Sequence, residues 1–189
     1  MTLTETRRQF AKDAPIYFAG DPAGRLLKVA RGAVMIFHIY DDGRRQIVDI
    51  VTEGELVHFQ FDGELDHYAE ALTQTTLIEV SADAALSDQA WAEFIFEQMR
   101  GRLARERRHI AMLGQKSAAE RLAEFLILVS ERLSTPLGDI ELPMTRQQIA
   151  DYTGLTIETV SRLFSRWTRE RRLVVTGKRT YRIEGALAA

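Results

Sequence analysis

The sequence contains no cysteine. This absence excludes disulfide bonds, thiolate zinc sites, cysteine nucleophiles and cysteine-ligated iron–sulfur clusters. Long apolar runs are absent too, because no stretch approaches the roughly 20 apolar residues that a membrane span needs. The N-terminal MTLTETRRQF also lacks the apolar core of a signal peptide. We therefore expect a cytoplasmic protein without a membrane partner.

The chain also lacks an excess of charge of one sign. Its 25 Lys and Arg residues oppose 27 Asp and Glu residues, giving a formal net charge of -2 over 189 residues. The distribution is uneven, because residues 141–189 carry nine basic and five acidic side chains, a net +4, which leaves -6 for the rest. A basic segment on an acidic body is typical of a chain with a DNA-contacting module. A hydrophobic content of 46% is enough for one large or two small cores.

The first 85 residues predict a small β-rich domain. Short β-like runs at 14–18, 26–29, 33–40, 45–51 and 75–80 alternate with Gly- and Asp-containing connections. Asp42-Gly43, between VMIFHIY and RRQIVDIV, is the clearest hairpin signal. Many short strands with evenly spaced turns indicate a barrel or sandwich.

Helical periodicity begins near Leu86 and continues to about Gly114, and a second helix is expected from Ala118 to Leu133, before turn formers at 134–139. The long helix carries an apolar seam interrupted by Glu106, which favours a symmetric dimer. The alternative is a helix lying on its own barrel. Most of the helix's five crowded arginines are expected on a solvated face. The expected dimer residues are Ala92, Phe96, Met99, Leu103, Ile110 and Leu113.

The stretch from Thr145 to Ser165 predicts a helix-turn-helix. Thr145 and Gln148 form a capping box, and Ala150 permits a close helix approach. Gly154 suits a left-handed turn, after which Thr156 caps a second helix that runs to about Arg169. Each position has a separate steric role, so the spacing is specific. The expected buried contacts are Ile149, Val160, Leu163, Phe164 and Trp167.

The outward positions at the start of the second helix are candidates for reading DNA bases. Arg162 can bind guanine O6 and N7, Glu158 can accept from cytosine N4, and Ser161 can serve a base or a phosphate. The alternative is a surface ion pair between Glu158 and Arg162, which are four residues apart. Residues 173–183 predict a wing whose basic tip lies along phosphates, with a solvated turn as the alternative for the tip. The candidate backbone contacts are Thr145, Arg146, Thr156, Thr159, Ser165, Lys178 and Arg179.

The segments RRHIAMLGQKSAAERLAEFLI and LPMTRQQIADYTGLTIETVSRLF resemble the C-terminal half of Crp/Fnr-family transcription regulators, particularly the FNR/FixK-like branch. The resemblance implies an α+β fold: a cyclic-nucleotide-binding-like β-roll (1–85), a dimerisation helix (86–114) and a winged helix-turn-helix (115–189). It places the branch's E-x-x-S-R pattern on Glu158, Ser161 and Arg162. It also implies a homodimer that binds TTGAT-like inverted repeats in double-stranded DNA and recruits or excludes RNA polymerase.

The sensor half departs from the cyclic-nucleotide pattern of that family. Aligning Gly54 with the family's turn places His58 and Phe59 at the Gly-Glu pair and His67 near the phosphate-binding arginine. We therefore expect no cyclic nucleotide and no other cofactor. Haem remains an alternative, with an axial ligand among the histidines His38, His58, His67 and His109. A cupin-type metal site would need a close His-x-His pair, which is absent, and no catalytic motif indicates an enzyme.

Overall fold

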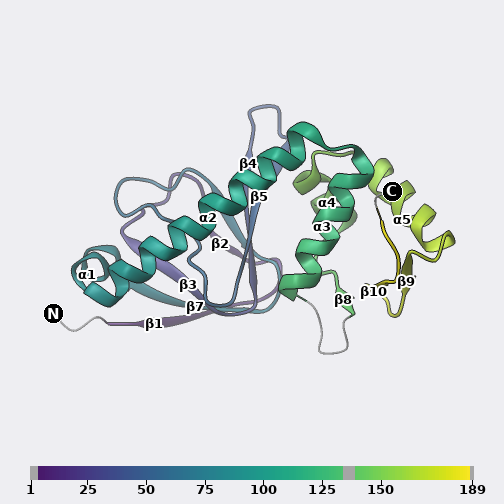
Figure 1. Cartoon of the computed structure of the whole chain (residues 1–189). Helices are drawn as coiled ribbons and strands as arrows, with labels where there is room; N and C mark the ends of the chain where they lie inside the picture. Colours follow the sequence, from purple (N-terminus) through teal and green to yellow (C-terminus); the bar gives the residue numbers. More distant parts are fainter. Residues whose placement is uncertain (1–3, 134–138, 188–189) are drawn as a thin grey trace. The chain divides into compact units, whose positions relative to one another are not determined.

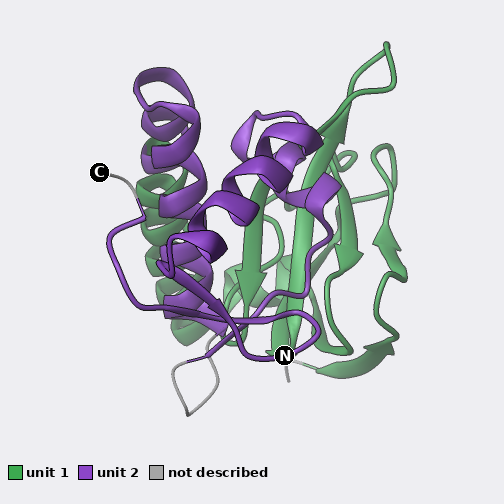
Figure 2. Cartoon of the chain, turned by 90° about the vertical axis from the view of Figure 1, so that its right-hand side faces the viewer, with its two compact units in different colours: residues 1–107 green, residues 108–189 purple. Residues whose placement is uncertain are grey.

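The computed structural model describes residues 4–133 and 139–187. The chain divides into two compact units, residues 1–107 and 108–189, which Figure 2 shows in different colours. The boundary falls inside a helix, α2 (Gln89–Gln115), so that one continuous helix belongs to both units. The α+β class expected from the sequence is confirmed.

The first unit contains two antiparallel sheets (Figure 1). One sheet has the strand order β1-β7-β3 and the other has the order β2-β6-β4-β5. Side chains from both sheets form a shared core that includes Leu27, Val34 and Val51. The strands are β1 (Thr6–Phe10), β2 (Pro15–Tyr17), β3 (Arg25–Arg31), β4 (Ala33–Ile39), β5 (Arg45–Thr52), β6 (Tyr68–Ala71) and β7 (Thr75–Ser81).

The predicted hairpin at Asp42-Gly43 is confirmed. Strands β4 and β5 pair from Ala33 opposite Thr52 to Ile39 opposite Arg45. Gly43 has a φ of 81°, a conformation that costs glycine little, and its amide donates to the Tyr40 carbonyl at 2.8 Å. Local turn chemistry thus sets the register of the longest strand pair in the unit.

Two strands of this unit were not expected from the sequence. Strand β1 reads TRRQF, and four of its five residues are exposed. It is an edge strand, held by pairing with β7 rather than by a buried face. Strand β6 has only four residues, YAEA, in an acidic stretch, and pairs with both β2 and β4. Neither strand carries the apolar alternation by which a strand is detected.

The long helix begins later than predicted, because α1 (Ala82–Ser87) is separated from α2 at Asp88. Asp88 has extended φ and ψ angles of -97° and 123°, and its Oδ1 atom accepts from the Trp91 amide at 3.0 Å. The helical segment expected from about Leu86 is thus interrupted at Asp88. With 27 residues α2 is about 40 Å long. The next helix, α3 (Ala118–Leu133), has the predicted bounds, whereas the turn expected at 134–138 lies outside the described residues.

The second unit places two short helices beside a three-stranded sheet. The helices are α4 (Arg146–Thr153) and α5 (Ile157–Arg169). Strands β8 (Ile140–Glu141), β9 (Leu173–Val175) and β10 (Thr180–Ile183) form an antiparallel sheet in the order β8-β10-β9. Strands β9 and β10 are the predicted wing. The buried side chains Phe125, Ile149 and Trp167 fill the centre of this unit.

Gly154 is expected to contribute measurably to stability. Its φ is 62°, and an added Cβ would lie 3.1 Å from Leu113 Cδ2. We expect Gly154→Ala to lower the free energy of unfolding by about 1 to 2 kcal/mol because an L side chain is strained there. The control Gly114→Ala lies in α2 with open space around it and should not destabilise. Urea unfolding of both variants checks this, and equal losses would contradict it.

Candidate nucleic-acid interface

The first helix of the motif begins at a complete capping box. The Gln148 amide donates to Thr145 Oγ1 at 3.1 Å, and the Thr145 amide donates to Gln148 Oε1 at 2.7 Å. Two amides that the helix leaves without partners are thereby satisfied. The start of α4 is fixed at Arg146, as the sequence predicted.

The turn and the second helix also follow the prediction. Gly154 ends α4 in the left-handed conformation, with φ 62° and ψ 35°. Thr156 then caps α5, its Oγ1 accepting from the Thr159 amide at 3.2 Å. One face of α5 enters the core, which leaves the opposite face in solvent. The buried side chains of α5 are Val160, Leu163, Phe164 and Trp167.

The three predicted base-reading side chains lie together on the exposed face of α5. Glu158, Ser161 and Arg162 are all exposed near the helix N-terminus. Arg162 Nη2 donates to Thr159 Oγ1 at 3.3 Å, and within the described residues no ion pair joins it to Glu158. The alternative of a Glu158–Arg162 surface pair therefore finds no support. The guanidinium keeps most of its five N–H donors for another acceptor.

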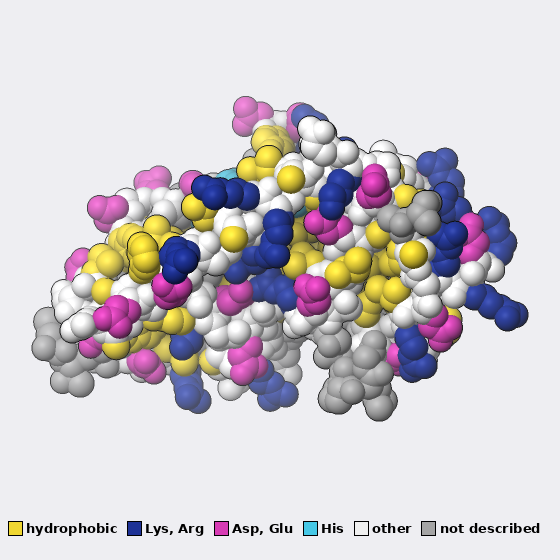
Figure 3. Space-filling view, in the orientation of Figure 1, with side chains coloured by type: hydrophobic (Ala, Val, Ile, Leu, Met, Phe, Trp, Pro, Cys, Tyr) yellow, Lys and Arg dark blue, Asp and Glu magenta, His cyan; other side chains and the backbone are white. Residues whose placement is uncertain are grey.

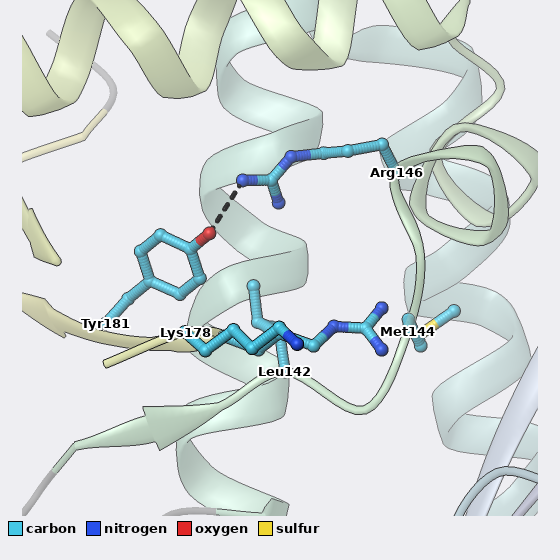
Figure 4. A pocket seen from close by; sticks show the side chains of 6 residues that line it. Leu142, Met144, Arg146, Lys178 and Tyr181 are labelled. Atoms are coloured by element: carbon cyan, nitrogen blue, oxygen red, sulfur yellow. Dashed lines mark hydrogen bonds between the residues drawn. The ribbon is translucent and has the colours of Figure 1, made fainter. Parts of the chain in front are cut away.

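A second cluster of cations lines a cavity between the start of α4 and the wing. The cavity has a volume of about 210 Å³ (Figure 4). Arg146 Nη2 donates to Tyr181 Oη at 2.9 Å, and its guanidinium lies 3.3 Å from the centre of the Phe164 ring. Burial lowers the pKa of Arg146, and the Tyr181 hydroxyl opposes that shift. The lining residues are Leu142, Met144, Arg146, Lys178, Arg179 and Tyr181.

The geometry of this cavity suits an anion. Arg146, Lys178 and Arg179 bring three positive side chains to one hollow, and within its described lining no carboxylate neutralises them. Phosphate oxygens are natural acceptors for such a group of donors. Figure 3 shows Lys and Arg side chains gathered around α5 and the β9–β10 turn, in agreement with the positive charge of this segment.

Sequence reasoning did not identify Tyr181 as part of the site. Its hydroxyl orients Arg146, although the two residues are 35 positions apart. A tyrosine between Thr180 and Arg182 is only a weak sequence signal for a binding site, because tyrosine is also common in strands for packing reasons.

The other predicted backbone contacts divide into two groups. Thr156 and Thr159 bond each other at 3.1 Å, whereas Ser165 is exposed on α5.

The expected dimer seam is an exposed apolar row on α2. Phe96 is 62% exposed and Ile110 is 69% exposed, and Met99 and Leu103 are exposed as well. Figure 3 shows hydrophobic side chains between the cationic ones along this helix. Ala92 and Leu113 are only half-buried positions, and Leu113 packs beside Gly154. Large apolar groups left in water along one helix are typical of an association surface.

The comparisons with known proteins agree with this architecture. The Crp-like helix-turn-helix domain matches residues 120–185, and the cyclic nucleotide-binding domain matches residues 7–87. The nitrogen fixation regulation protein FixK of Rhizobium meliloti is 38% identical over 159 residues, which are 84% of this chain and 73% of FixK. The fumarate and nitrate reduction regulatory protein of Yersinia pestis is 31% identical over 93% of this chain and 74% of its own length.

This chain belongs to the Crp/Fnr family. Among solved structures, FixK2 from Bradyrhizobium japonicum is similar, with a TM-score of 0.89 and 32% identity over 97% of this chain and 94% of that one. The regulator TTHB099 from Thermus thermophilus shares the fold, with a TM-score of 0.84, 20% identity, and coverage of 95% and 92%. The FNR/FixK-like branch is confirmed, and the relatives regulate transcription rather than catalyse a reaction.

Segment 53–71 of this Crp/Fnr protein departs from the phosphate-binding pattern of the cyclic nucleotide-binding domain. Residues 53–71 contain no Lys or Arg and six carboxylates, so the segment lacks the cation that a phosphate needs. His67, expected near the position of the phosphate-binding arginine, is buried between Tyr17 and Asp66. Its Nε2 atom is 2.6 Å from Tyr17 Oη, and its Nδ1 atom contacts Asp66. The ring is therefore committed to protein partners.

The other histidines do not gather into a metal centre. Within the described residues, no group of three or more His, Asp or Glu side chains is placed to hold an ion. His109 stacks on the Tyr152 ring at 4.2 Å, in the other unit from the remaining histidines. His58 lines a cavity of about 430 Å³, and its Nδ1 atom is buried without a hydrogen-bond partner among the described residues. No described helix is both long and apolar enough to cross a membrane.

The buried His58 should make this regulator acid-sensitive. Burial lowers the pKa of His58 to about 4, and His67 shifts it in the same direction. The unfolded chain takes up this proton near pH 6.5 and the folded chain only near pH 4, so stability falls as the pH drops through that window. Between pH 7.5 and 4 the free energy of unfolding should therefore fall by roughly 3 kcal/mol less in His58→Gln than in the wild type. Urea unfolding across pH measures it, and parallel curves for both proteins would contradict it.

Proposed function

We propose that this Crp/Fnr regulator binds TTGAT-like inverted repeats as a homodimer and requires no cofactor to do so. The observation that carries the proposal is the exposed group Glu158, Ser161 and Arg162 at the start of α5, with Arg162 not paired to Glu158. In a helix-turn-helix this part of the second helix reaches the base edges in the major groove. The three side chains match the E-x-x-S-R pattern that the resemblance associates with such repeats.

The cationic cavity supports a second set of contacts, to the DNA backbone. We assign phosphate contacts to Arg146, Lys178 and Arg179, whose side chains line the same hollow. The Tyr181 hydroxyl and the Phe164 ring hold Arg146 in place, which reduces the entropy lost when a phosphate binds. Contacts of this kind fix the register of the protein without reading sequence. Thr145, Thr156, Thr159 and Ser165 complete the proposed set.

The dimer is proposed from the seam on α2. Two copies related by a twofold axis would cover Phe96, Met99, Leu103 and Ile110, with Ala92 and Leu113 at the edges. The twofold axis would place the two recognition helices about one DNA turn apart. Because the two copies are related by that axis, their half-sites would form an inverted repeat. In functional terms the chain then divides into a β-roll (1–85), a dimerisation helix (86–114) and a DNA-binding domain (115–189).

We further propose that the bound dimer controls transcription in the cytoplasm by recruiting or excluding RNA polymerase. FixK and the fumarate and nitrate reduction regulatory protein are named as regulators, and this chain aligns with them over most of its length. The absence of cysteine removes cluster-based oxygen sensing, and the acidic segment 53–71 disfavours a cyclic nucleotide. Control through the abundance of the protein follows from these two exclusions.

A second candidate is a regulator whose DNA binding depends on haem or another small molecule. The buried Nδ1 of His58, beside a cavity of about 430 Å³, favours it. Absorbance separates the candidates. Protein purified from haem-supplemented cells should be colourless and bind DNA unaided if no cofactor is used. A Soret band, together with DNA binding that needs haem, would support the second candidate.

Arg162 and Lys178 should differ in how their loss affects DNA binding. Arg162→Ala should cost about 1 to 3 kcal/mol on the repeat and relax preference at one guanine, because a bidentate base contact is lost. Lys178→Ala should lower the affinity for all DNA sequences alike. It should also reduce the slope of log affinity against log salt concentration by about 1. Fluorescence anisotropy on repeat and scrambled duplexes checks both, and equal losses of Arg162→Ala on the two duplexes would contradict the assignment.

The seam on α2 should be required for the dimer but not for the fold. Leu103→Glu places a carboxylate on an already exposed position, so the monomer should fold normally while self-association is lost. Affinity for the full repeat should fall by about 100-fold or more, because the two half-sites are no longer bound together. Glu97→Gln, exposed on another side of the helix, is the control. Sedimentation gives the mass, and a dimeric Leu103→Glu protein would exclude this interface.

A further inference from the structure

One arginine of α2 is buried, in contrast to its neighbours. Arg102 is 8% exposed, whereas Arg100, Arg107 and Arg108 are exposed. Arg102 Nη1 donates to the Val57 carbonyl at 3.0 Å. Its Nε atom lies 3.3 Å from Asp49 Oδ2 and 3.2 Å from Glu106 Oε1. Arg102 is therefore an exception to the solvated face expected for most of these arginines, and its charge is directed into the β-roll.

A second arginine, one helical turn further on, reinforces this contact. Arg105 Nη2 lies 3.4 Å from Asp49 Oδ2, and its Nη1 lies 3.1 Å from Glu55 Oε1. Asp49, on β5, is only 5% exposed and therefore depends on these two cations. Glu55 also accepts from the Thr52 amide at 2.7 Å. Two cations on one helix thus bind the end of β5 and the turn that follows it.

Ionic contacts at this position add a geometric requirement that apolar packing would not impose. An apolar side chain could seal the same interface, and replacing a buried ion pair by apolar groups is often neutral or stabilising. A guanidinium is planar and directional, so it can contact the Val57 carbonyl and the Asp49 carboxylate of the β-roll only in a narrow range of positions. The contacts therefore restrict both the height of α2 along β5 and its rotation about its own axis.

The rotation of α2 matters because the helix carries the exposed seam on another face. At 3.6 residues per turn, the seam of Phe96, Met99, Leu103 and Ile110 lies about a third of a turn from Arg102 and Arg105. Glu106, the polar interruption of the seam, is itself paired with Arg102. A helix free to roll would turn its apolar row away from a symmetric partner. The same helix continues past Arg107 to Gln115.

We infer that Arg102, assisted by Arg105, is a positioning residue for DNA binding that holds α2 in its active orientation through the chain's own contacts. The inference rests on the proposed function. The Val57 carbonyl precedes His58, which lines the β-roll cavity, and the Arg102 guanidinium lies 5.9 Å from the centre of the Phe59 ring. Arg102 thus binds the segment 57–59 directly, so that no small molecule is needed to link this segment to α2.

The test compares Arg102→Ala with Arg100→Ala in the full-length protein without additives. Arg100 is exposed on the same helix and pairs with Glu97 at 2.9 Å. Binding to a TTGAT inverted repeat and to a scrambled duplex is measured at 15 °C, with folding and mass checked by circular dichroism and sedimentation. Arg102→Ala should lose about tenfold or more on the repeat and little on the scrambled duplex, while Arg100→Ala should match the wild type.

Two further measurements separate positioning from general stability. Amide hydrogen exchange should become faster within residues 95–107 of Arg102→Ala and stay unchanged in β4. Arg102→Lys keeps the charge but cannot form the same fork of contacts, so its affinity should be intermediate. Should Arg102→Ala fail to fold, Asp49→Asn removes the buried acceptor charge with little change of shape, and it should show the same selective loss.

The outcomes are distinct. A folded, dimeric Arg102→Ala protein with wild-type affinity for the repeat would overturn the inference. The inference would also be overturned if the loss of affinity only matched the fraction of unfolded protein, or if it were equal on both duplexes. Arg102 would then have a structural role only. If the wild type itself does not prefer the repeat, the proposed function fails first. If the wild type prefers the repeat and Arg102→Ala binds it equally well, the positioning role of Arg102 fails while the proposed function stands.

Discussion

The burial of one face of α5 is the constraint on which the DNA-binding unit depends. Val160, Leu163, Phe164 and Trp167 enter the core, and Trp167 is fully buried. Because α5 is amphipathic, this packing leaves Glu158, Ser161 and Arg162 in solvent near the helix N-terminus. The same packing brings the Phe164 ring beneath Arg146, which in turn is bonded to Tyr181 of the wing. The apolar core thus positions both the residues proposed to read bases and the cations proposed to bind phosphates.

The β-roll contains two networks of buried polar contacts. His67 is held by Tyr17 and Asp66, and Arg102 binds Asp49 and the Val57 carbonyl. Polar groups in a low-dielectric interior are costly unless satisfied, so such networks restrict the conformations open to the chain. Such a restriction is what the proposed cofactor-free regulator would need, because no ligand would select its active state. The cavity beside His58 is the part of the β-roll that this network leaves open.

The sequence was most informative where structure is determined by neighbouring residues. The Asp42-Gly43 turn, the Thr145–Gln148 capping box and the left-handed Gly154 each depend on chemistry within a few positions, and all were predicted. Strands β1 and β6 were missed because their pairing partners, not their own apolar residues, hold them in place. The contact between Arg146 and Tyr181 and the burial of Arg102 depend on residues 35 and 45 positions away. No local pattern encodes such contacts.

The most direct test of the central claim is the binding of purified, additive-free protein to a duplex with a TTGAT inverted repeat and to a scrambled duplex over a series of salt concentrations. We expect selective binding, with the repeat preferred by about 10³-fold or more at physiological salt. Both affinities should decline with salt, because phosphate contacts release counterions. Equal affinity for the two duplexes at every salt concentration would contradict the assignment of Glu158, Ser161 and Arg162 as base-reading residues.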